Sequence, residues 1–321
     1  MKRLGLRLDG RGGLQPQYFA SRRWIQTDVA LMQHLPKKSA FHLAFFRHLL
    51  RDANVDQNGS TSRMGAVMTT VHARAQSLAA DPGLIDDLVA ANRILYEQGV
   101  VDGFGHVSVR HDKNAEHFLL ARSMAPGLVT TTDIMEFDRH GNAVDPQGRA
   151  VYLERYIHSE IYKTHPEVKA IVHSQSPAVI PFGVTTVPLR PIFHLSSFLG
   201  AGAPVFEIRE AGGPATDMLI RTPELGAALS RALGTAPVAL MRGHGDVVVA
   251  PSLKEAVFRA VYTEVNARLE AEALRLAPLG QVTFLNDEEA AKATATNAGV
   301  LIRAWDLWKA KALAGTAITT R

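Results

Sequence analysis

Residues 168–175, Val-Lys-Ala-Ile-Val-His-Ser-Gln, decide the fold of this 321-residue chain. An apolar run of this length is typical of a strand buried inside a sheet, and we expect the strand over 168–173. His173 ends the run and Gln175 lies two residues on, so both side chains project from the same face of an extended segment. The stretch therefore predicts a buried strand that presents two polar side chains at its end.

Helical and strand patterns alternate on both sides of this stretch. The expected helices are 84–96, 154–163, 224–233 and 253–276, and the other expected strands are 106–110, 118–121 and 238–241. The strands 106–110 and 118–121 are separated by a polar turn and predict a hairpin. Interleaved strands and helices over about 250 residues predict one α/β domain whose sheet is covered on both faces.

The basic residues are unevenly distributed. Residues 1–63 hold 11 Lys and Arg against 4 Asp and no Glu, whereas residues 64–321 hold 24 Lys and Arg against 27 Asp and Glu. The net charge of +4 therefore comes from the first segment, which shows no sustained period apart from a possible helix over 40–50. We expect an unstructured basic extension over 1–63 and a single domain over 64–321.

Several classes of partner are not expected. Basic residues interleaved with aromatics are absent from the domain, which argues against nucleic acid. The sequence contains no run of about 18 apolar residues, so no membrane span is expected. The N-terminal segment also lacks the apolar block of a secretory signal. A cytoplasmic enzyme with a small-molecule substrate is the expectation.

The chain contains no cysteine, so a metal would have to be held by His, carboxylate or amide ligands. His173 ends one apolar strand, and His244 follows another, between two glycines that let the backbone come close to a neighbour. Glu154 begins the helix that precedes the His173 strand. Two imidazoles and a carboxylate from these positions predict a divalent-metal site with open positions, where Glu154 can also accept or donate a proton.

These residues also carry a resemblance. Residues 154–158, 162–168, 170–177 and 244–245 resemble the class II aldolase and adducin family, whose pattern is Glu, His-x-His and His-Gly. The resemblance spans about 84–273 and implies an α/β/α sandwich, a homotetramer and a divalent ion, Zn, Mn or Fe, on three histidines beside a glutamate. Glu154 then matches the catalytic glutamate, and His173 and His244 match the first and third metal histidines.

Gln175 stands where the family has its second metal histidine. An amide oxygen is a poorer ligand for zinc, manganese or iron than an imidazole is, so weaker binding or an altered geometry is expected. His194 or His106 is a candidate substitute ligand. A decayed copy with little activity is the opposite alternative, and the sequence leaves both open.

The phosphate cradle of the family's sugar-phosphate aldolases is also missing. Its small and hydroxyl residues are replaced here by Gly105-His106, Ser123-Met124 and Tyr152-Leu153, so a flat substrate is more plausible than a sugar phosphate.

Residues 99–110, 123–126 and 261–268 resemble a subgroup of the family that decarboxylates hydroxypyridine and aromatic acids. This resemblance implies a metal-dependent carbon–carbon lyase. We expect His106, Glu154 and Tyr262 to be the candidate proton donors, and Arg122, Ser123 and His194 to be candidate substrate contacts.

Two other functions remain open at this point. One is an aldolase or epimerase acting on a non-phosphorylated hydroxy-carbonyl compound. The other is a weakly metal-binding pseudoenzyme or scaffold, which the glutamine at position 175 favours. His158, one turn after Glu154 on the same helix, is expected either to orient that glutamate or simply to pack.

Overall fold

The computed structural model describes residues 79–314. The extension predicted over 1–63, its helix over 40–50 and the boundary at 63/64 lie outside the described residues. Within them, seven strands form one sheet in the order β3-β2-β1-β4-β7-β6-β5. The strands are β1 His106–Arg110, β2 His117–Ala121, β3 Ile134–Asp138, β4 Ala170–Ser174, β5 Val205–Phe206, β6 Val238–Met241 and β7 Gly245–Ala250. β5 pairs with β6 in parallel, and all other neighbours are antiparallel.

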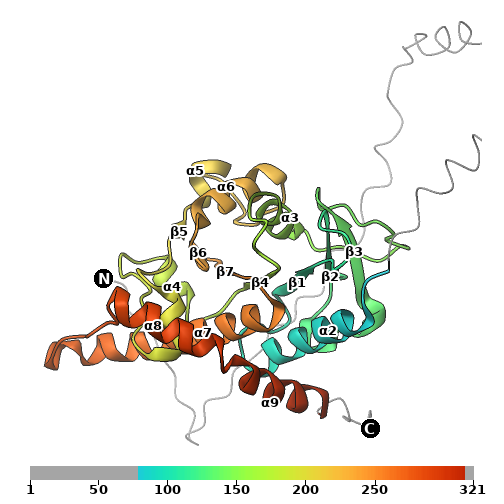
Figure 1. Ribbon diagram of the computed structural model, residues 1–321. Helices are drawn as coiled ribbons and strands as arrows, with labels where there is room; N and C mark the ends of the chain where they lie inside the picture. The colour runs from blue at the N-terminus through green and yellow to red at the C-terminus, as the bar shows by residue number, and fades with distance from the viewer. Residues whose placement is uncertain (1–78, 315–321) are drawn as a thin grey trace, which may run out of the picture. The chain divides into compact units, whose positions relative to one another are not determined.

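The helices lie on both faces of this sheet, as Figure 1 shows. The α-helices are α2 Pro82–Glu97, α3 Arg155–Thr164, α4 Ile180–Gly183, α5 Ile208–Gly212, α6 Pro223–Leu233, α7 Leu253–Leu276, α8 Asp287–Ala298 and α9 Leu301–Ala314. Four short 3-10 helices are η1 Pro126–Leu128, η2 Thr131–Asp133, η3 His194–Leu199 and η4 Ala277–Leu279.

Alternation along the strands divides the core into two layers. Val107 and Val172 pack with α2, α7 and α9 on one face, whereas Ile171 and Val247 pack with α3 and α6 on the other. This is the three-layer α/β/α arrangement, and the prediction of a sheet covered on both faces is confirmed. His173 is two residues after Ile171, so its side chain lies on the α3 face.

The expected elements are found within two residues of their predicted ends. The strand 238–241 and the helix 253–276 match β6 and α7. The sequence interpretation did not include β3, β5 and β7, nor α8 and α9. β7 begins at Gly245, which the sequence analysis named only as a glycine next to His244, and it lies beside β4 in the middle of the sheet.

Gly245 permits a close approach between these two central strands. A Cβ atom added at Gly245 would lie 1.9 Å from the carbonyl oxygen of Ser174. No side chain fits there, because that distance is far inside van der Waals contact. The glycine therefore lets the turn after β6 bring His244 against the end of β4.

Candidate metal centre

His173 is fixed at the end of β4 by the neighbouring strand. Its side chain is fully buried, and its Nδ1 donates a hydrogen bond to the carbonyl oxygen of Asp246 on β7 at 2.9 Å. A carbonyl oxygen only accepts, so the proton of the neutral ring lies on Nδ1 and the lone pair on Nε2. Nε2 is therefore available as a metal ligand.

His244 is held in the same way, in the turn between β6 and β7. Its Nδ1 donates to the carbonyl oxygen of Met218 at 2.9 Å. Its Nε2 consequently also carries a lone pair. The rings of His173 and His244 are edge-on to one another, with centroids 4.9 Å apart.

Glu154 completes this group from the start of α3. Its Oε1 accepts a hydrogen bond from the backbone N–H of Ile220 at 3.0 Å, and its Oε2 lies 3.5 Å from Nε2 of both His173 and His244. Burial alone would raise the pKa of the Glu154 carboxyl, but hydrogen bonds and charges from the two histidines hold that pKa well below its ordinary value. Burial alone would lower the pKa of His173, and Glu154 raises it above its ordinary value.

Gln175 lies between the two imidazoles, as its spacing from His173 predicts. Its Nε2 is 3.4 Å from Nε2 of His173 and 3.4 Å from Nε2 of His244. Its Oε1 is buried and has no hydrogen-bond partner within the described residues. With the amide flipped, so that Oε1 and Nε2 exchange positions, Gln175 would offer Oε1 as an oxygen ligand to an ion between the histidines.

These donors fit a divalent metal. Oε2 of Glu154 lies 3.5 Å from Nε2 of each imidazole, and a cation bound among them would take the place of the protons that these nitrogens share with the carboxylate. Two histidines and a glutamate, with room for oxygen ligands, are a set that zinc, manganese and iron accept. Glu154 and His173 would hold the ion together with His244.

His106 is the additional histidine of this site. It lies directly opposite His173 in the β1–β4 ladder, is 3% exposed, and offers a ligand atom within 4.8 Å of those of Glu154 and His173. Burial, together with the nearby His158 and His173, lowers the pKa of His106 well below its ordinary value, so the ring is neutral. Of the two substitutes expected for the missing imidazole, the structure therefore brings His106 to the cluster.

The structure does not bring His194 there. His194 is exposed at the start of η3, and its carbonyl oxygen accepts a hydrogen bond from Asn297 of α8. Tyr262 is also directed elsewhere, because its ring packs against Phe258, Phe193 and Trp308. On α7 it lies two residues before Glu264, which bonds Ser176, so the two side chains face nearly opposite directions.

Arg122 and Ser123 lie at the edge of the site. Arg122 is paired with Asp133 at 2.6 Å, and Ser123 is exposed. The next residue, Met124, accepts a hydrogen bond from the hydroxyl of Tyr152 at 2.5 Å, and the Tyr152 ring lies 4.6 Å from that of His106. Tyr152 thus separates this segment from the histidines.

His158 has a different partner from the one expected. Its Nε2 lies 2.7 Å from Nδ1 of His106, and its Nδ1 lies 2.7 Å from the hydroxyl of Ser108. Of the two alternatives left open for His158, these contacts do not support the one in which it orients Glu154. The i, i+2 pair of His106 and Ser108 beside the i, i+4 pair of His158 and Tyr162 was the sequence signal that could have found this contact.

A cavity of about 430 Å³ opens beside Gln175. Tyr96, Phe104, Val101 and Pro177 are among its lining residues, and the side chains of Tyr96 and Phe104 are 54% and 71% exposed. Aromatic and aliphatic walls next to a cluster of ligand atoms are the usual arrangement of a small-molecule site.

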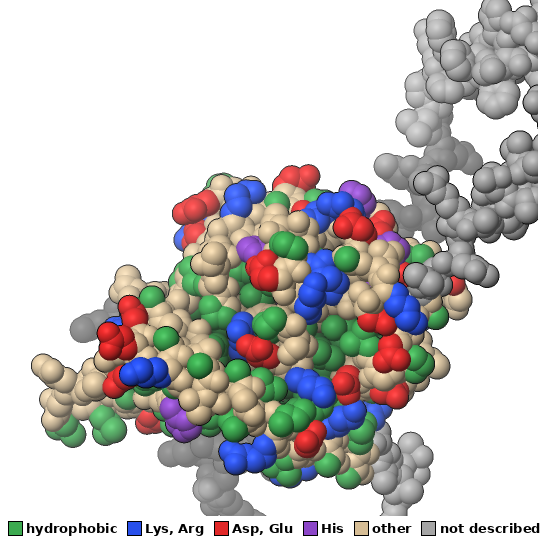
Figure 2. Space-filling view, viewed as in Figure 1, with side chains coloured by type: hydrophobic (Ala, Val, Ile, Leu, Met, Phe, Trp, Pro, Cys, Tyr) green, Lys and Arg blue, Asp and Glu red, His purple; other side chains and the backbone are tan. Residues whose placement is uncertain are grey.

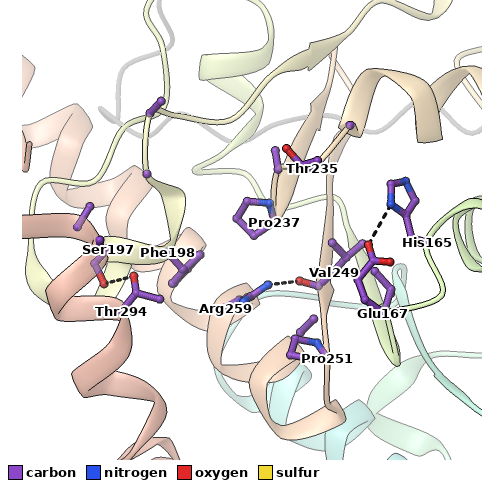
Figure 3. A pocket seen from close by; sticks show the side chains of 18 of the residues that line it. His165, Glu167, Ser197, Phe198, Thr235, Pro237, Val249, Pro251, Arg259 and Thr294 are labelled. Atoms are coloured by element: carbon purple, nitrogen blue, oxygen red, sulfur yellow. Dashed lines mark hydrogen bonds and ion pairs between the residues drawn. The ribbon is translucent and has the colours of Figure 1, made fainter. Parts of the chain in front are cut away.

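A second cavity, of about 640 Å³, lies at the other end of the strands (Figure 3). Pro237, Val249 and Arg259 line it, together with His165 and Thr294. In the β4–β7 ladder Ala250 pairs with Ala170 at one end, whereas His173 pairs with Val247 next to the Ser174–Asp246 pair at the other end. This larger cavity is therefore remote from the convergent histidines, and we do not assign it to the reaction.

The surface around the fold carries charges of both signs. On the face seen in Figure 2, Lys and Arg side chains are interspersed with Asp and Glu. Among the helices of residues 79–314, none combines the length and the apolarity that a membrane span requires.

The sequence and the fold agree with those of known proteins. The profile described as "Class II Aldolase and Adducin N-terminal domain" matches residues 86–271. The chain belongs to this family. The decarboxylase tropJ of Talaromyces stipitatus is 36% identical over 240 residues, covering 68% of this chain and 90% of that protein. The 3,4-dihydroxyphthalate decarboxylase of Arthrobacter keyseri is 30% identical over 205 residues, covering 59% and 78%.

Among solved structures, the L-fuculose 1-phosphate aldolase of Glaciozyma antarctica superposes with a TM-score of 0.58. It is 23% identical and covers 71% of this chain and 88% of that one, so the likeness speaks for the fold. Within the class II aldolase and adducin family, the chain is thus a homologue of carbon–carbon lyases, including decarboxylases.

Proposed function

We propose that this protein is a metal-dependent decarboxylase of a hydroxylated aromatic or heteroaromatic carboxylic acid. The observation that carries the proposal is the convergence of His173, His244 and Glu154, with Oε2 of the glutamate 3.5 Å from both imidazoles. The 36% and 30% identical relatives, both decarboxylases, support the same reaction class.

A divalent ion bound here would supply Lewis acidity toward a ring hydroxyl and the adjacent carboxylate. His173 and His244 would hold it through Nε2, because their Nδ1 atoms are committed to backbone carbonyls. Zinc, manganese and iron all suit these ligands.

Proton transfer to the ring carbon falls to residues beside the ion. Glu154 is the first candidate, and His106 is the alternative in a site where it does not bind the ion, since both are buried at the cluster and both carry strongly shifted pKa values. Tyr262 is not proposed for this step, because its ring packs among Phe258, Phe193 and Trp308.

The cavity beside Gln175 supports an aromatic substrate. Tyr96 and Phe104 can stack on a flat ring. Neither provides the several hydrogen-bond donors that the phosphate group of a sugar phosphate requires. Outside this lining, Tyr152, in place of a small hydroxyl residue, puts an aromatic ring 4.6 Å from the ring of His106.

An aldolase or epimerase remains the second candidate, because the solved structure with the likeness above is an aldolase and bond cleavage by either route leaves electrons for a bound ion to stabilise. The homotetramer implied by the family resemblance and the cytoplasmic location expected from the sequence remain predictions. Sedimentation of the purified protein would test the first.

The test of the function is CO₂ release from hydroxylated aromatic acids by the full chain, with 3,4-dihydroxyphthalate among the substrates. We expect release that a chelator abolishes and a divalent ion restores. Aldehyde formation without CO₂ would favour the aldolase. Release that survives both chelation and the His173→Ala and His244→Ala changes would overturn the metal-dependent mechanism.

A further inference from the structure

A buried chain of hydrogen bonds leads away from the metal cluster. Nδ1 of His106 is 2.7 Å from Nε2 of His158, whose Nδ1 is 2.7 Å from Oγ of Ser108, which is 2.9 Å from the hydroxyl of Tyr162. The four residues are 0–5% exposed. The Tyr162 hydroxyl ends the chain at the carbonyl oxygen of Lys169, 3.4 Å away.

Two matched spacings build this chain. His106 and Ser108 are two residues apart on β1, a separation of about 6.7 Å along a strand. His158 and Tyr162 are four residues apart on α3, a separation of about 6 Å along a helix. Because the two separations nearly agree, the two pairs interlock where α3 packs on the sheet.

The surroundings keep the chain buried and its side chains neutral. Phe118 stacks on His158 with ring centroids 6.2 Å apart and also packs on Tyr162 at 5.4 Å. Burial lowers the pKa of His158 to about 3 and raises that of the Tyr162 hydroxyl above its ordinary value. Each of the four side chains therefore carries one exchangeable proton.

Four protons are thus shared among three links, and one is left over. If Tyr162 donates to Ser108 and the order continues along the chain, the extra proton lies on Nε2 of His106, which then cannot bind a metal. If His106 donates to His158 and the order runs the other way, the extra proton lies on Tyr162, directed at Lys169. Nε2 of His106 then presents a lone pair.

We propose that His158, Ser108 and Tyr162 are positioning residues that let His106 serve as the imidazole ligand missing at Gln175, by taking up its proton when a metal binds. The inference rests on the proposed metal site. Without metal, the long 3.4 Å contact to Lys169 and the nearby Glu154 carboxylate favour a proton on Nε2 of His106. With metal, the whole chain reverses its direction and the number of protons is unchanged.

The proton of His158 reports this reversal. It lies on Nε2 without metal and on Nδ1 with metal, and ¹⁵N NMR of histidine-labelled protein distinguishes the two tautomers. We expect the His158 proton to move from Nε2 to Nδ1 when Zn²⁺ is added to the full chain. His158 is not itself a ligand, so a merely structural role would leave its tautomer unchanged.

Tyr162→Phe tests the far end of the chain. Without the Tyr162 hydroxyl, the metal-bound arrangement leaves the buried Ser108 proton with no acceptor. In the metal-free arrangement Ser108 still donates to His158, and its oxygen loses only the hydrogen bond that it accepts from Tyr162. We expect Zn²⁺ affinity to fall roughly 10- to 100-fold, as outer-shell changes typically cause. Tyr156→Phe is the matched control, because Tyr156 lies on the same helix and bonds Arg155 instead.

The outcomes separate the two proposals. An unchanged His158 tautomer at saturating Zn²⁺, or wild-type affinity in Tyr162→Phe, overturns the inference and leaves the metal site standing. Failure of the unaltered chain to bind Zn²⁺, Mn²⁺ and Fe²⁺ alike overturns the proposed function and this inference together. The spectra of the unaltered chain decide the matter even if Tyr162→Phe does not fold.

Discussion

His106 and His173 face each other across the antiparallel β1–β4 ladder, with ring centroids 5.0 Å apart. Directly opposite residues on one face of a sheet lie close enough to touch. The pairing joins a residue that the sequence resemblance places at the family's phosphate cradle to a proposed metal ligand. The two departures from the family pattern expected from the sequence, at His106 and at Gln175, thus both lie beside His173.

Removal of the ligands should abolish metal binding. In His173→Ala or His244→Ala we expect the affinity for Zn²⁺ to fall by more than the roughly 10- to 100-fold that outer-shell changes cost. Equilibrium dialysis with metal analysis measures it. His140→Ala, at an exposed turn position, is the control and should bind as the unaltered chain does.

Gln175→His should tighten metal binding and slow turnover. The Gln175 amide lies 3.4 Å from both imidazoles, so an imidazole in its place adds a nitrogen ligand where substrate oxygens need an open position. The Kd for Zn²⁺ and kcat for decarboxylation measure the two effects. Gln175→Leu, with similar bulk and no ligand atom, should not tighten binding. A faster Gln175→His enzyme would mark the natural site as impaired.

Glu270 should make the protein less stable as the pH rises. Its carboxyl is fully buried, one oxygen has no partner within the described residues, and burial raises its pKa to about 7 from 4.5. The folded state therefore holds a proton that the unfolded state loses above pH 4.5, so this stability is present below that pH and is lost through pH 7.

Between pH 5 and pH 8 the loss should be about 2 kcal/mol, measured as the free energy of unfolding in urea. Glu270→Gln should remove this dependence. The exposed Glu272, two residues on along α7, provides the control in Glu272→Gln. Equal pH dependence in the two variants would contradict the assignment.

Trp305 lies on α9, outside the residues 86–271 that match the family, and we expect it to contribute as much to the free energy of unfolding as a large core residue within that region. It is 2% exposed in the core beside α2 and α7, and the ammonium of Lys254 lies 5.6 Å from its ring centroid. Trp305→Ala should destabilise the fold by about 3 to 5 kcal/mol, and thermal unfolding would measure the loss. Leu307→Ala, where the leucine is 53% exposed, should cost far less.

The sequence predicted the parts of the fold whose periodicity is local. α7 is 24 residues long and β6 is an uninterrupted run of four apolar residues, and their ends were correct. β5 is only two residues long, and α8 is polar around most of its surface, so neither gives a periodic signal. Such elements form because tertiary packing, not propensity, stabilises them.

The site divides in the same way. Glu154, His173, Gln175 and His244 were found because strand ends and helix starts bring them together, and the structure places these four side chains in contact. His106 and His194 could not be told apart from sequence, since only the β1–β4 register decides between them. The direction that Tyr262 faces depends on α9, an element the sequence interpretation did not include.

Gly245 limits how this site can change over evolution or in a directed-evolution library. Since even a methyl group there would overlap the carbonyl oxygen of Ser174, no other residue fits at position 245, whatever the substrate. Randomised codons are better used at Tyr96 and Phe104, whose exposed rings border the cavity and support no strand. New substrate preferences should therefore arise at the mouth of the site while the turn that carries His244 stays unaltered.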